Sequence, residues 1–462
     1  MSVNDFSRVA LSWRPARAEL GGGPVYLALA AALERDVASG RLLPGTRLPS
    51  QRELADFLDL NFTTVTRAFD LCREKGLVYG VVGRGTFVAS LPGVNAPARR
   101  AAADFGVVQG FPGVGARAVV AAARAVLSRA DAERLFSYDA RDGAARVREA
   151  GRRWLARARV EAPIARLAVF PGVQSALSVA LLSLFRVGEA LAVDTFTYGN
   201  LIRLARMANV RLVPVRGDDE GMRPDALEEA ARTRRVRGVF LMPTCANPTA
   251  RTLRGGRRDA LARVARAHDL FVLEDDAHLG GEAEEAPLQA RLPERTVYLA
   301  GASRLLAAGL RATFVVMPEG VRARLLAALH NTAIKASALD AEILGELILS
   351  GAADALLARK RAAARRANAV FDAVFGAAAG PADDARLFRA LPLPGTAGRG
   401  REVERALAAQ GLVAFHSDRF RVGTSAEDAF LRVSVSNGGG ERRLAQGLRA
   451  LARACAGAGR AR

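Results

Sequence analysis

The spacing of apolar residues near the start of the chain changes from that of helices to that of strands. Leu29, Leu33 and Val37 recur at the spacing of one helical face, and Gly40 ends that segment. Two more helical segments follow, and after them come short apolar runs typical of strands. The pattern predicts three helices and then two strands, over residues 25–39, 50–60, 62–75, 77–82 and 86–89.

Local signals at the ends of these elements agree with that order. Ser50 and Glu53 have capping-box spacing, in which the serine caps the helix and the glutamate bonds back to it. The glycines of Gly83-Arg84-Gly85 favour a tight turn between the two strands. Helix, helix-turn-helix and β-hairpin in this order predict a winged helix over residues 24–90. Residues 1–23 form an N-terminal arm to which the sequence assigns no role.

A second pattern begins after a weakly patterned stretch, residues 91–104, which we interpret as a linker. From residue 105 to 462, short apolar runs alternate with helical stretches, which is typical of an α/β domain with a mostly parallel sheet. The predicted strands are Leu167–Phe170, Ala190–Val193, Arg211–Val215, Gly238–Met242, Leu270–Leu273, Val297–Leu299 and Ala312–Val316.

Composition narrows the class of protein. At 462 residues with 50% hydrophobic residues, the chain can build more than one core, and no apolar run is suited to span a bilayer. Cys72, Cys245 and Cys455 are odd in number and far apart, which favours a reducing cytoplasm over disulfides or structural zinc. The net charge of +20 indicates little by itself, because residues 24–90 hold eight basic and seven acidic side chains.

The string P-G-T-R-L-P-S-x-R-E-L-A at residues 44–55 resembles the DNA-binding domain of GntR-family bacterial repressors. The resemblance implies that the helix over 62–75 enters the major groove of promoter DNA and that the wing approaches the minor groove. That helix usually starts with arginine, where this chain has Phe62, a side chain that contacts a thymine methyl or packs internally. The implied DNA-binding residues are Arg47, Arg52, Phe62, Thr63, Thr64, Thr66, Arg67, Gly83, Arg84 and Gly85.

Motifs at the predicted strand ends resemble the fold-type I aminotransferases over about 105–462. That family binds pyridoxal phosphate (PLP), and its phosphate sits at a helix N-terminus, where backbone N–H groups lack partners. The resemblance places the phosphate at Gly172-Val173-Gln174 with Arg311, and a substrate or effector carboxylate at Arg432.

Three further residues match the positions that hold the PLP ring. Tyr198 matches the aromatic residue that stacks on the ring, Asn247 the partner of its hydroxyl, and Asp275 the carboxylate that pairs with its nitrogen. Each also has an ordinary structural interpretation: a core aromatic for Tyr198, a turn for Asn247, a helix cap for Asp275 and a surface charge for Arg432.

The chain departs from the family at the Schiff-base lysine, where it carries Arg304. A guanidinium stays protonated and cannot condense with an aldehyde, so the resemblance implies no catalytic residue. The only lysines are Lys75, Lys335 and Lys360, and none lies in a motif that replaces the missing one. Three more departures surround the same site: Gly301, Ala250 and Ala277-His278, where the histidine is either a substitute ring contact or a structural residue.

A winged helix joined to an aminotransferase-like domain is the layout of MocR-type regulators. The resemblance implies a cytoplasmic, head-to-tail homodimeric transcription factor whose large domain senses a small anionic effector. PLP bound without a covalent bond is one candidate, a different anion is another, and no metal is expected. The rival hypothesis is a working PLP enzyme with an appended DNA-binding domain, against which Arg304 counts.

Overall fold

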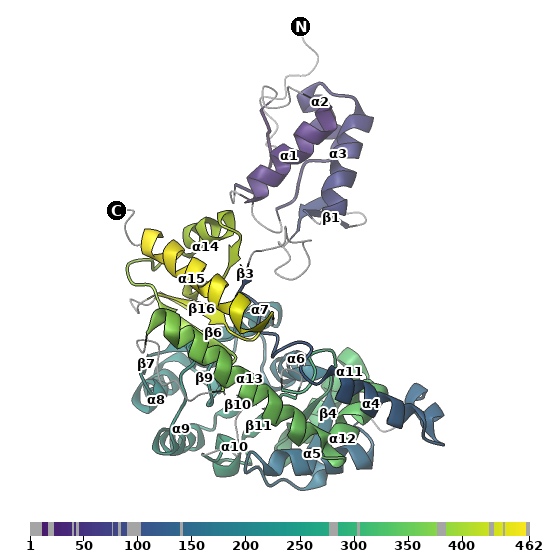
Figure 1. The fold of residues 1–462 in the computed structure, drawn as a ribbon, viewed down its shortest axis with the longest axis vertical. Helices are drawn as coiled ribbons and strands as arrows, with labels where there is room; N and C mark the ends of the chain where they lie inside the picture. The colour runs from purple at the N-terminus through teal and green to yellow at the C-terminus, as the bar shows by residue number, and fades with distance from the viewer. Residues whose placement is uncertain are drawn as a thin grey trace. The chain divides into compact units, whose positions relative to one another are not determined.

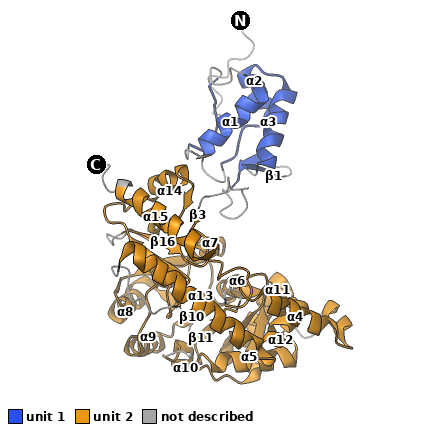
Figure 2. Cartoon of the chain, viewed as in Figure 1, with its two compact units in different colours: residues 1–100 blue, residues 101–462 orange. Residues whose placement is uncertain are grey.

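The computed structural model describes residues 12–16, 23–38, 41–42, 46–75, 77–81, 85–89, 103–138, 142–276, 285–302, 305–376, 385–424, 429–437 and 439–458. The chain divides into two compact units, residues 1–100 and 101–462, which are described separately (Figure 2). No helix in this described part is both long and apolar enough to cross a membrane.

The first unit has the element order expected of a winged helix. Its elements are α1 (Val25–Ala38), α2 (Gln51–Leu58), α3 (Phe62–Glu74), β1 (Val78–Val81) and β2 (Gly85–Val88). The capping box is confirmed: the Glu53 backbone donates to Ser50 Oγ at 3.2 Å, and the Ser50 backbone donates to Glu53 Oε2 at 2.7 Å. These bonds lower the pKa of the Glu53 carboxyl, the larger contribution being the Ser50 backbone N–H.

A third extended segment pairs with the hairpin of β1 and β2. Arg47 forms a bridge with Phe87, the Leu48 N–H donates to the Thr86 carbonyl at 2.8 Å, and the Val88 N–H donates to that of Thr46 at 2.9 Å. This bridge and these two hydrogen bonds hold residues 46–48 alongside β2, next to the two-stranded sheet. The predicted wing residues Gly83 and Arg84 lie outside the described residues.

The second unit is built on a seven-stranded sheet in the order β4-β12-β11-β10-β9-β5-β6 (Figure 1). Its strands are β4 (Leu167–Phe170), β5 (Ala190–Asp194), β6 (Arg211–Val215), β9 (Val236–Leu241), β10 (Phe271–Asp276), β11 (Thr296–Ala300) and β12 (Thr313–Val316). Strand β12 runs antiparallel to both its neighbours, β4 and β11, and the other strand pairs of this sheet are parallel. The prediction of an α/β unit with a mostly parallel sheet is therefore confirmed.

Helices cover both faces of this sheet, as its apolar strands require. One face packs on α6 (Gly172–Leu184), α7 (Gly199–Met207) and α11 (Glu319–Ala333). Over β5, β9 and β10, the other face packs on α8 (Pro224–Arg234), α9 (Gly255–Ala267) and α10 (Leu288–Arg291). Over β4, β11 and β12 it joins a core formed with α4 (Ala116–Leu127), α5 (Ala145–Ala156), α12 (Ala338–Leu349) and α13 (Ala352–Phe375).

The C-terminal part adds a smaller antiparallel sheet of β13 (Phe388–Pro392), β16 (Phe430–Ser434) and β15 (Phe415–His416). It packs with α14 (Gly400–Ala409) and α15 (Gly440–Ala458), while β7 (Gly217–Asp218) and β8 (Gly221–Met222) form a short hairpin elsewhere. Strand β3 (Ala103–Asp104) pairs with β14 (Leu412–Val413). The linker prediction over 91–104 was therefore wrong for its last two residues, because backbone pairing fixes them in the large unit.

Candidate functional site

The predicted ligand residues of the large unit gather at one edge of the sheet. The carboxyl ends of β4, β5, β9, β10 and β11 meet there, and the start of β12 lies at the same edge because that strand is antiparallel. Gly172 follows β4, Tyr198 follows β5, Asn247 follows β9 and Asp275 lies near the end of β10. Arg311 precedes β12. This edge is where ligands bind in α/β sheets.

The start of α6 and the side chain of Arg311 form an anion cradle. Gly172 has a φ of +81°, and a Cβ placed there would lie 2.5 Å from Nη2 of Arg311. Arg311 is exposed, and its backbone N–H donates to Asp340 Oδ2 at 3.4 Å. Glycine thus allows a guanidinium to approach the N–H groups at a helix N-terminus, an arrangement suited to a phosphate.

Gln174, Tyr198 and Asn200 form a small polar cluster beside this helix start. The Tyr198 hydroxyl donates to Gln174 Oε1 at 3.3 Å, and Asn200 Nδ2 donates to the Tyr198 oxygen at 3.1 Å. These bonds hold the Tyr198 ring on the α6 side of the edge, where it is half-buried. Sequence reasoning missed Asn200; its signal was an amide in the first turn of α7, two residues after Tyr198. Val173 packs against the core under α6.

Asn247 and Arg432 come together although they lie far apart in the sequence. Arg432 Nη1 donates to Asn247 Oδ1 at 3.0 Å, and Nη2 donates to the Gly106 carbonyl. The guanidinium carbon lies 4.9 Å from the ring centre of Phe420 and 5.4 Å from that of Phe415. Arg432 is only 7% exposed, so it is a buried cation held by protein oxygens rather than a surface charge.

Strand β10 carries three consecutive carboxyl groups with different surroundings. Asp275 is 3% exposed and lies within the strand, which excludes its interpretation as a helix cap. Glu274 accepts the backbone N–H groups of Leu288 and Gln289 at 2.9 and 2.8 Å, and burial raises its pKa to about 7. The Tyr298 hydroxyl donates to Asp276 at 2.7 Å. Glu274 therefore fastens β10 to α10, and Asp275 is the one that matches the ligand position.

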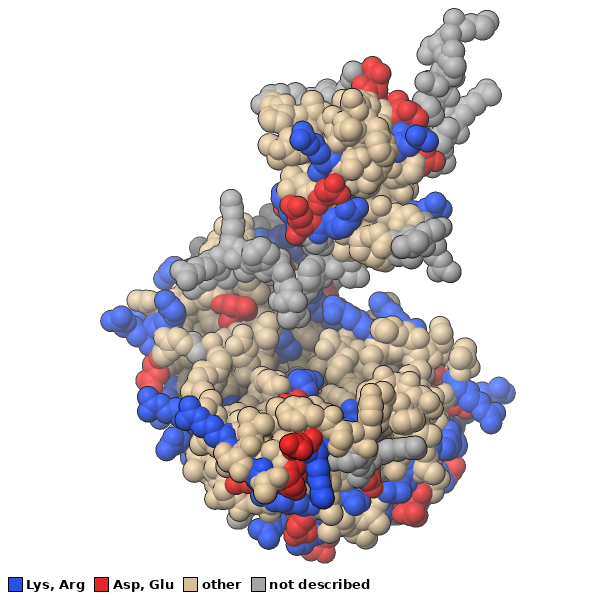
Figure 3. Space-filling model, turned by 90° about the vertical axis from the view of Figure 1, so that its right-hand side faces the viewer, with Lys and Arg blue, Asp and Glu red and all other residues tan. Residues whose placement is uncertain are grey.

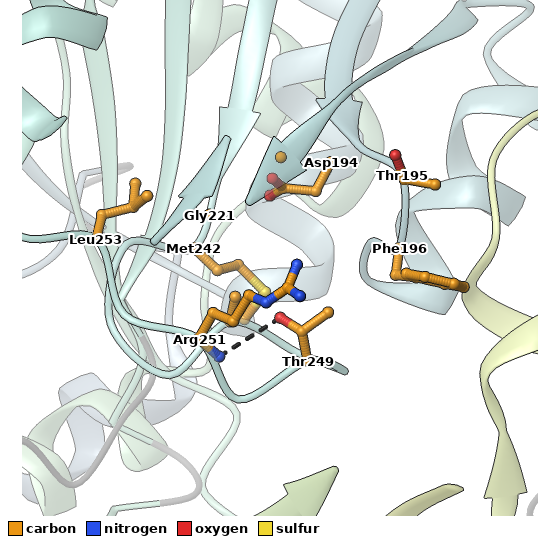
Figure 4. Close-up of a pocket in the computed structure, with 10 residues that line it drawn as sticks. Asp194, Thr195, Phe196, Gly221, Met242, Thr249, Arg251 and Leu253 are labelled. Atoms are coloured by element: carbon orange, nitrogen blue, oxygen red, sulfur yellow. Dashed lines mark hydrogen bonds between the residues drawn. The ribbon is translucent and has the colours of Figure 1, made fainter. Parts of the chain in front are cut away.

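A neighbouring hollow between the ends of β5 and β9 is too small for a ring-shaped ligand. It encloses about 20 Å³, which is room for about one water molecule. Figure 4 shows Asp194, Thr195 and Phe196 on one side and Arg251 with Thr249 on the other; the Arg251 N–H donates to Thr249 Oγ1 at 3.4 Å. The hollow lies at the same edge of the sheet, but none of the predicted ligand residues Gly172, Tyr198, Asn247, Asp275 and Arg311 lines it.

Helix α3, the helix predicted to enter the major groove, exposes some of the residues predicted to contact DNA, whereas others bond within the protein. Phe62 is 49% exposed, and Thr63 and Arg67 are also exposed, whereas Thr64 is half-buried. The Thr66 hydroxyl is engaged within the protein, with Gln51 Oε1 and the Phe62 carbonyl both at 3.0 Å. Because about half of Phe62 is exposed, its side chain packs only partly against the protein, and the exposed part is an apolar surface that a base can contact.

Of the predicted DNA-binding arginines outside that helix, the two that the structure describes, Arg52 and Arg47, are both exposed. Arg52 lies in the first turn of α2, and Arg47 lies beside the wing, with Nε 3.2 Å from where a Cβ on Gly85 would be. Acidic and basic side chains are interspersed on the face shown in Figure 3, so no uniform basic stripe appears there among the described residues. The predicted DNA contacts on this unit are therefore individual exposed side chains and not part of a continuous basic surface on that face.

Some predicted site residues lie outside the described residues. These are His278 and Arg304 of the large unit and Gly83 and Arg84 of the wing. Their roles remain predictions from the sequence.

Fold and site together define a DNA-binding helix-turn-helix unit joined to an aminotransferase-like unit. The family "Bacterial regulatory proteins, gntR family" matches residues 25–88, and "Aminotransferase class I and II" matches residues 110–451. The chain belongs to both families, and it is a transcriptional regulator with an aminotransferase-like domain, as the MocR-type layout predicted.

Relatives described as transcriptional regulators match most of the chain. It is 31% identical to the uncharacterized HTH-type transcriptional regulator YdeF of Bacillus subtilis, over 98% of this chain and 99% of the relative. It is 24% identical to the probable rhizopine catabolism regulatory protein MocR of Rhizobium meliloti, over 71% and 72% of the two chains.

Solved structures share the fold of the large unit. The α-aminoadipate aminotransferase LysN of Thermus thermophilus, solved with N-(5'-phosphopyridoxyl)-L-leucine, has a TM-score of 0.68 at 24% identity, covering 77% of this chain and 92% of that one. An archaeal alanine:glyoxylate aminotransferase has a TM-score of 0.70 at 20% identity, covering 76% and 89%.

Proposed function

We propose that this regulator binds promoter DNA as a homodimer and that its large unit senses a small anionic effector without catalysing a reaction. The observation that carries the sensing role is the approach of Arg311 to Gly172 at the start of α6. A cation and the N–H donors of a helix N-terminus converge there on one point, as anion binding requires. The exposed residues of α3 support the DNA-binding role.

PLP is the first effector to consider, because the residues at the sheet edge fit its parts. Arg311 and the α6 N-terminus suit the phosphate, buried Asp275 suits the ring nitrogen, and Tyr198 and Asn247 flank the same edge. PLP supplies an aldehyde that condenses with amines, and Arg304 offers no amine for that bond. The proposal is therefore non-covalent binding and no turnover.

A different phosphate or carboxylate is the second candidate effector. Gly301 and Ala277 lack the side chains that usually contact PLP, which favours this alternative. Arg432 bonds Asn247 and the Gly106 carbonyl with two of its five N–H donors. A ligand carboxylate that binds this guanidinium would therefore share it with contacts between the small C-terminal sheet and the rest of the large unit.

Footprinting of the wild-type protein is expected to show a discrete site in a promoter, occupied by a dimer on two half-sites. Arg52→Ala and Arg67→Ala should each weaken binding by about 1–3 kcal/mol if the guanidinium bonds a base in bidentate fashion. Arg35→Ala is the matched control, since Arg35 is an exposed arginine on α1 of the same unit. Salt-labile coating of any DNA, with no protected site, would refute specific recognition.

Borohydride reduction in the presence of PLP is expected to leave no pyridoxyl group on the peptide that contains residue 304. The reason is that reduction traps only an imine, which arginine does not form. Mass spectrometry of the digested protein measures the adduct, and Arg304→Lys is the converse variant that should gain one. A stoichiometric adduct on Lys75, Lys335 or Lys360 of the wild type would contradict the proposal.

A further inference from the structure

Residues 12–16 pack against the DNA-binding unit although they precede the predicted winged helix; we call them the N-terminal strap. Their burial alternates: Trp13 and Pro15 are buried, whereas the other three residues of the strap are exposed. Such alternation is typical of an extended segment lying on a surface. The sequence assigned this region no role, since five residues with one tryptophan form no recognisable motif.

Trp13 anchors the strap in the core of the unit. It is 4% exposed and belongs to the same apolar cluster as Leu33 and Leu48. Its indole Nε1 donates to Asp36 Oδ2 at 2.9 Å, and Asp36 Oδ1 pairs with Arg41 at 3.1 Å. A buried indole with its N–H satisfied is a stable anchor, so the strap is a built part of this unit.

Ser12 ties the strap to a residue at the proposed DNA interface. Its hydroxyl donates to the backbone carbonyl of Arg47. Residues 46–48, here called the Arg47 segment, pair on their other side with β2 through the N–H groups of Leu48 and Val88. The Arg47 side chain lies beside Gly85 at the wing. The strap and the wing therefore hold the Arg47 segment between them.

We propose that the N-terminal strap positions Arg47 for DNA and thereby sets the affinity of the regulator for its site. The inference rests on the proposed function, in which Arg47 contacts DNA. The conformational entropy that a segment loses on binding weakens the affinity. A segment that is already held on both sides in the free protein loses little of it. The strap acts through Arg47 and does not itself need to touch DNA.

Ser12→Ala in the full chain tests this role with little risk to folding, because Ser12 is exposed. We expect its Kd for the footprinted promoter site to rise about two- to tenfold, which is the effect of one hydrogen bond. Ser12→Thr keeps a hydroxyl and should restore the affinity. Ser12→Ala combined with Arg47→Ala should bind no more weakly than Arg47→Ala alone, since the two changes act on one contact.

Fluorescence provides a second readout that does not involve DNA. Trp13 and Trp154 are the only tryptophans, so Trp154→Phe leaves Trp13 as the sole reporter. Its emission should be blue-shifted, as for a buried indole, and should move to the red when the first unit unfolds. Emission typical of a solvated indole in the native chain would overturn the strap's docking.

The outcomes separate the strap from the proposed function. If the wild type binds no discrete DNA site, the proposed function is wrong. If the wild type binds and Ser12→Ala binds equally well, the positioning role of the strap is wrong. Additive losses in the double variant would also overturn it, because the strap would then contact DNA independently of Arg47.

Discussion

Arg311→Ala is expected to abolish the stabilisation of the large unit by small phosphate ligands. A ligand that binds only the native state at a hundred times its Kd adds about 2.7 kcal/mol, which raises the Tm of a unit of this size by roughly 4 °C. Removing the guanidinium beside Gly172 leaves only helix N–H groups to hold the phosphate. Thermal melting with PLP, and separately with inorganic phosphate, measures the loss.

Two variants control for this result. Arg67 lies in the first unit, so Arg67→Ala should leave the ligand-induced rise in Tm unchanged. Arg311→Lys keeps the charge without the planar fork and should retain part of the shift. A shift that survives Arg311→Ala would place the ligand elsewhere. A wild type that responds to no phosphate or dicarboxylate would make the large unit a dimerisation scaffold.

Arg389→Ala should lower the free energy of unfolding of the large unit by about 3–5 kcal/mol. Arg389 is 1% exposed, and it bonds Asn368 Oδ1 at 3.1 Å and pairs with Asp372 at 3.0 Å. Its guanidinium carbon also lies 4.9 Å from the ring centre of Phe371. The substitution leaves the Asp372 charge uncompensated and opens a cavity between β13 and α13.

Arg366→Ala is the matched control, since Arg366 lies on α13, the helix that carries the Arg389 partners Asn368 and Asp372. Arg366 pairs with Glu441 at 2.9 Å, but both side chains are more than half exposed, so the loss should stay below about 1 kcal/mol. Denaturant unfolding followed by Trp154 fluorescence in a Trp13→Phe background reports the large unit alone. If both variants lowered the free energy of unfolding equally, the buried ion pair would contribute no more to stability than the exposed one.

The elements of both units could be predicted because their signals are local. The capping box at Ser50 and Glu53 formed as expected, and the strands Leu167–Phe170 and Arg211–Val215 have the predicted bounds. Helix and strand ends elsewhere moved by one to three residues, as for β10, which starts at Phe271 and continues to Asp276. The periodicity of apolar residues shows where a helix or strand lies. Its exact ends depend on hydrogen bonds, which for a strand are those to the neighbouring strands.

The sequence also showed, without any coordinates, that residue 304 is an arginine and that no lysine occupies a matching motif. The proposal that no Schiff base forms at this position rests on that observation, because a guanidinium stays protonated and cannot condense with an aldehyde. The contacts between residues that are far apart in the sequence could not be predicted in the same way. Asn247 and Arg432 are 185 positions apart, and their 3.0 Å bond follows from how the small sheet packs on the large unit.

Only the tertiary structure placed Trp13 in the core of the DNA-binding unit, since a lone tryptophan before a helix has no periodic partner. The family resemblance had already grouped Arg311 with Gly172, and the structure added how closely the two approach. Residue types and their spacing determined the two folds and the proposal that no imine forms at position 304. The contacts between distant segments were decided by packing, since burial is a property of the whole fold and not of neighbouring residues in the sequence.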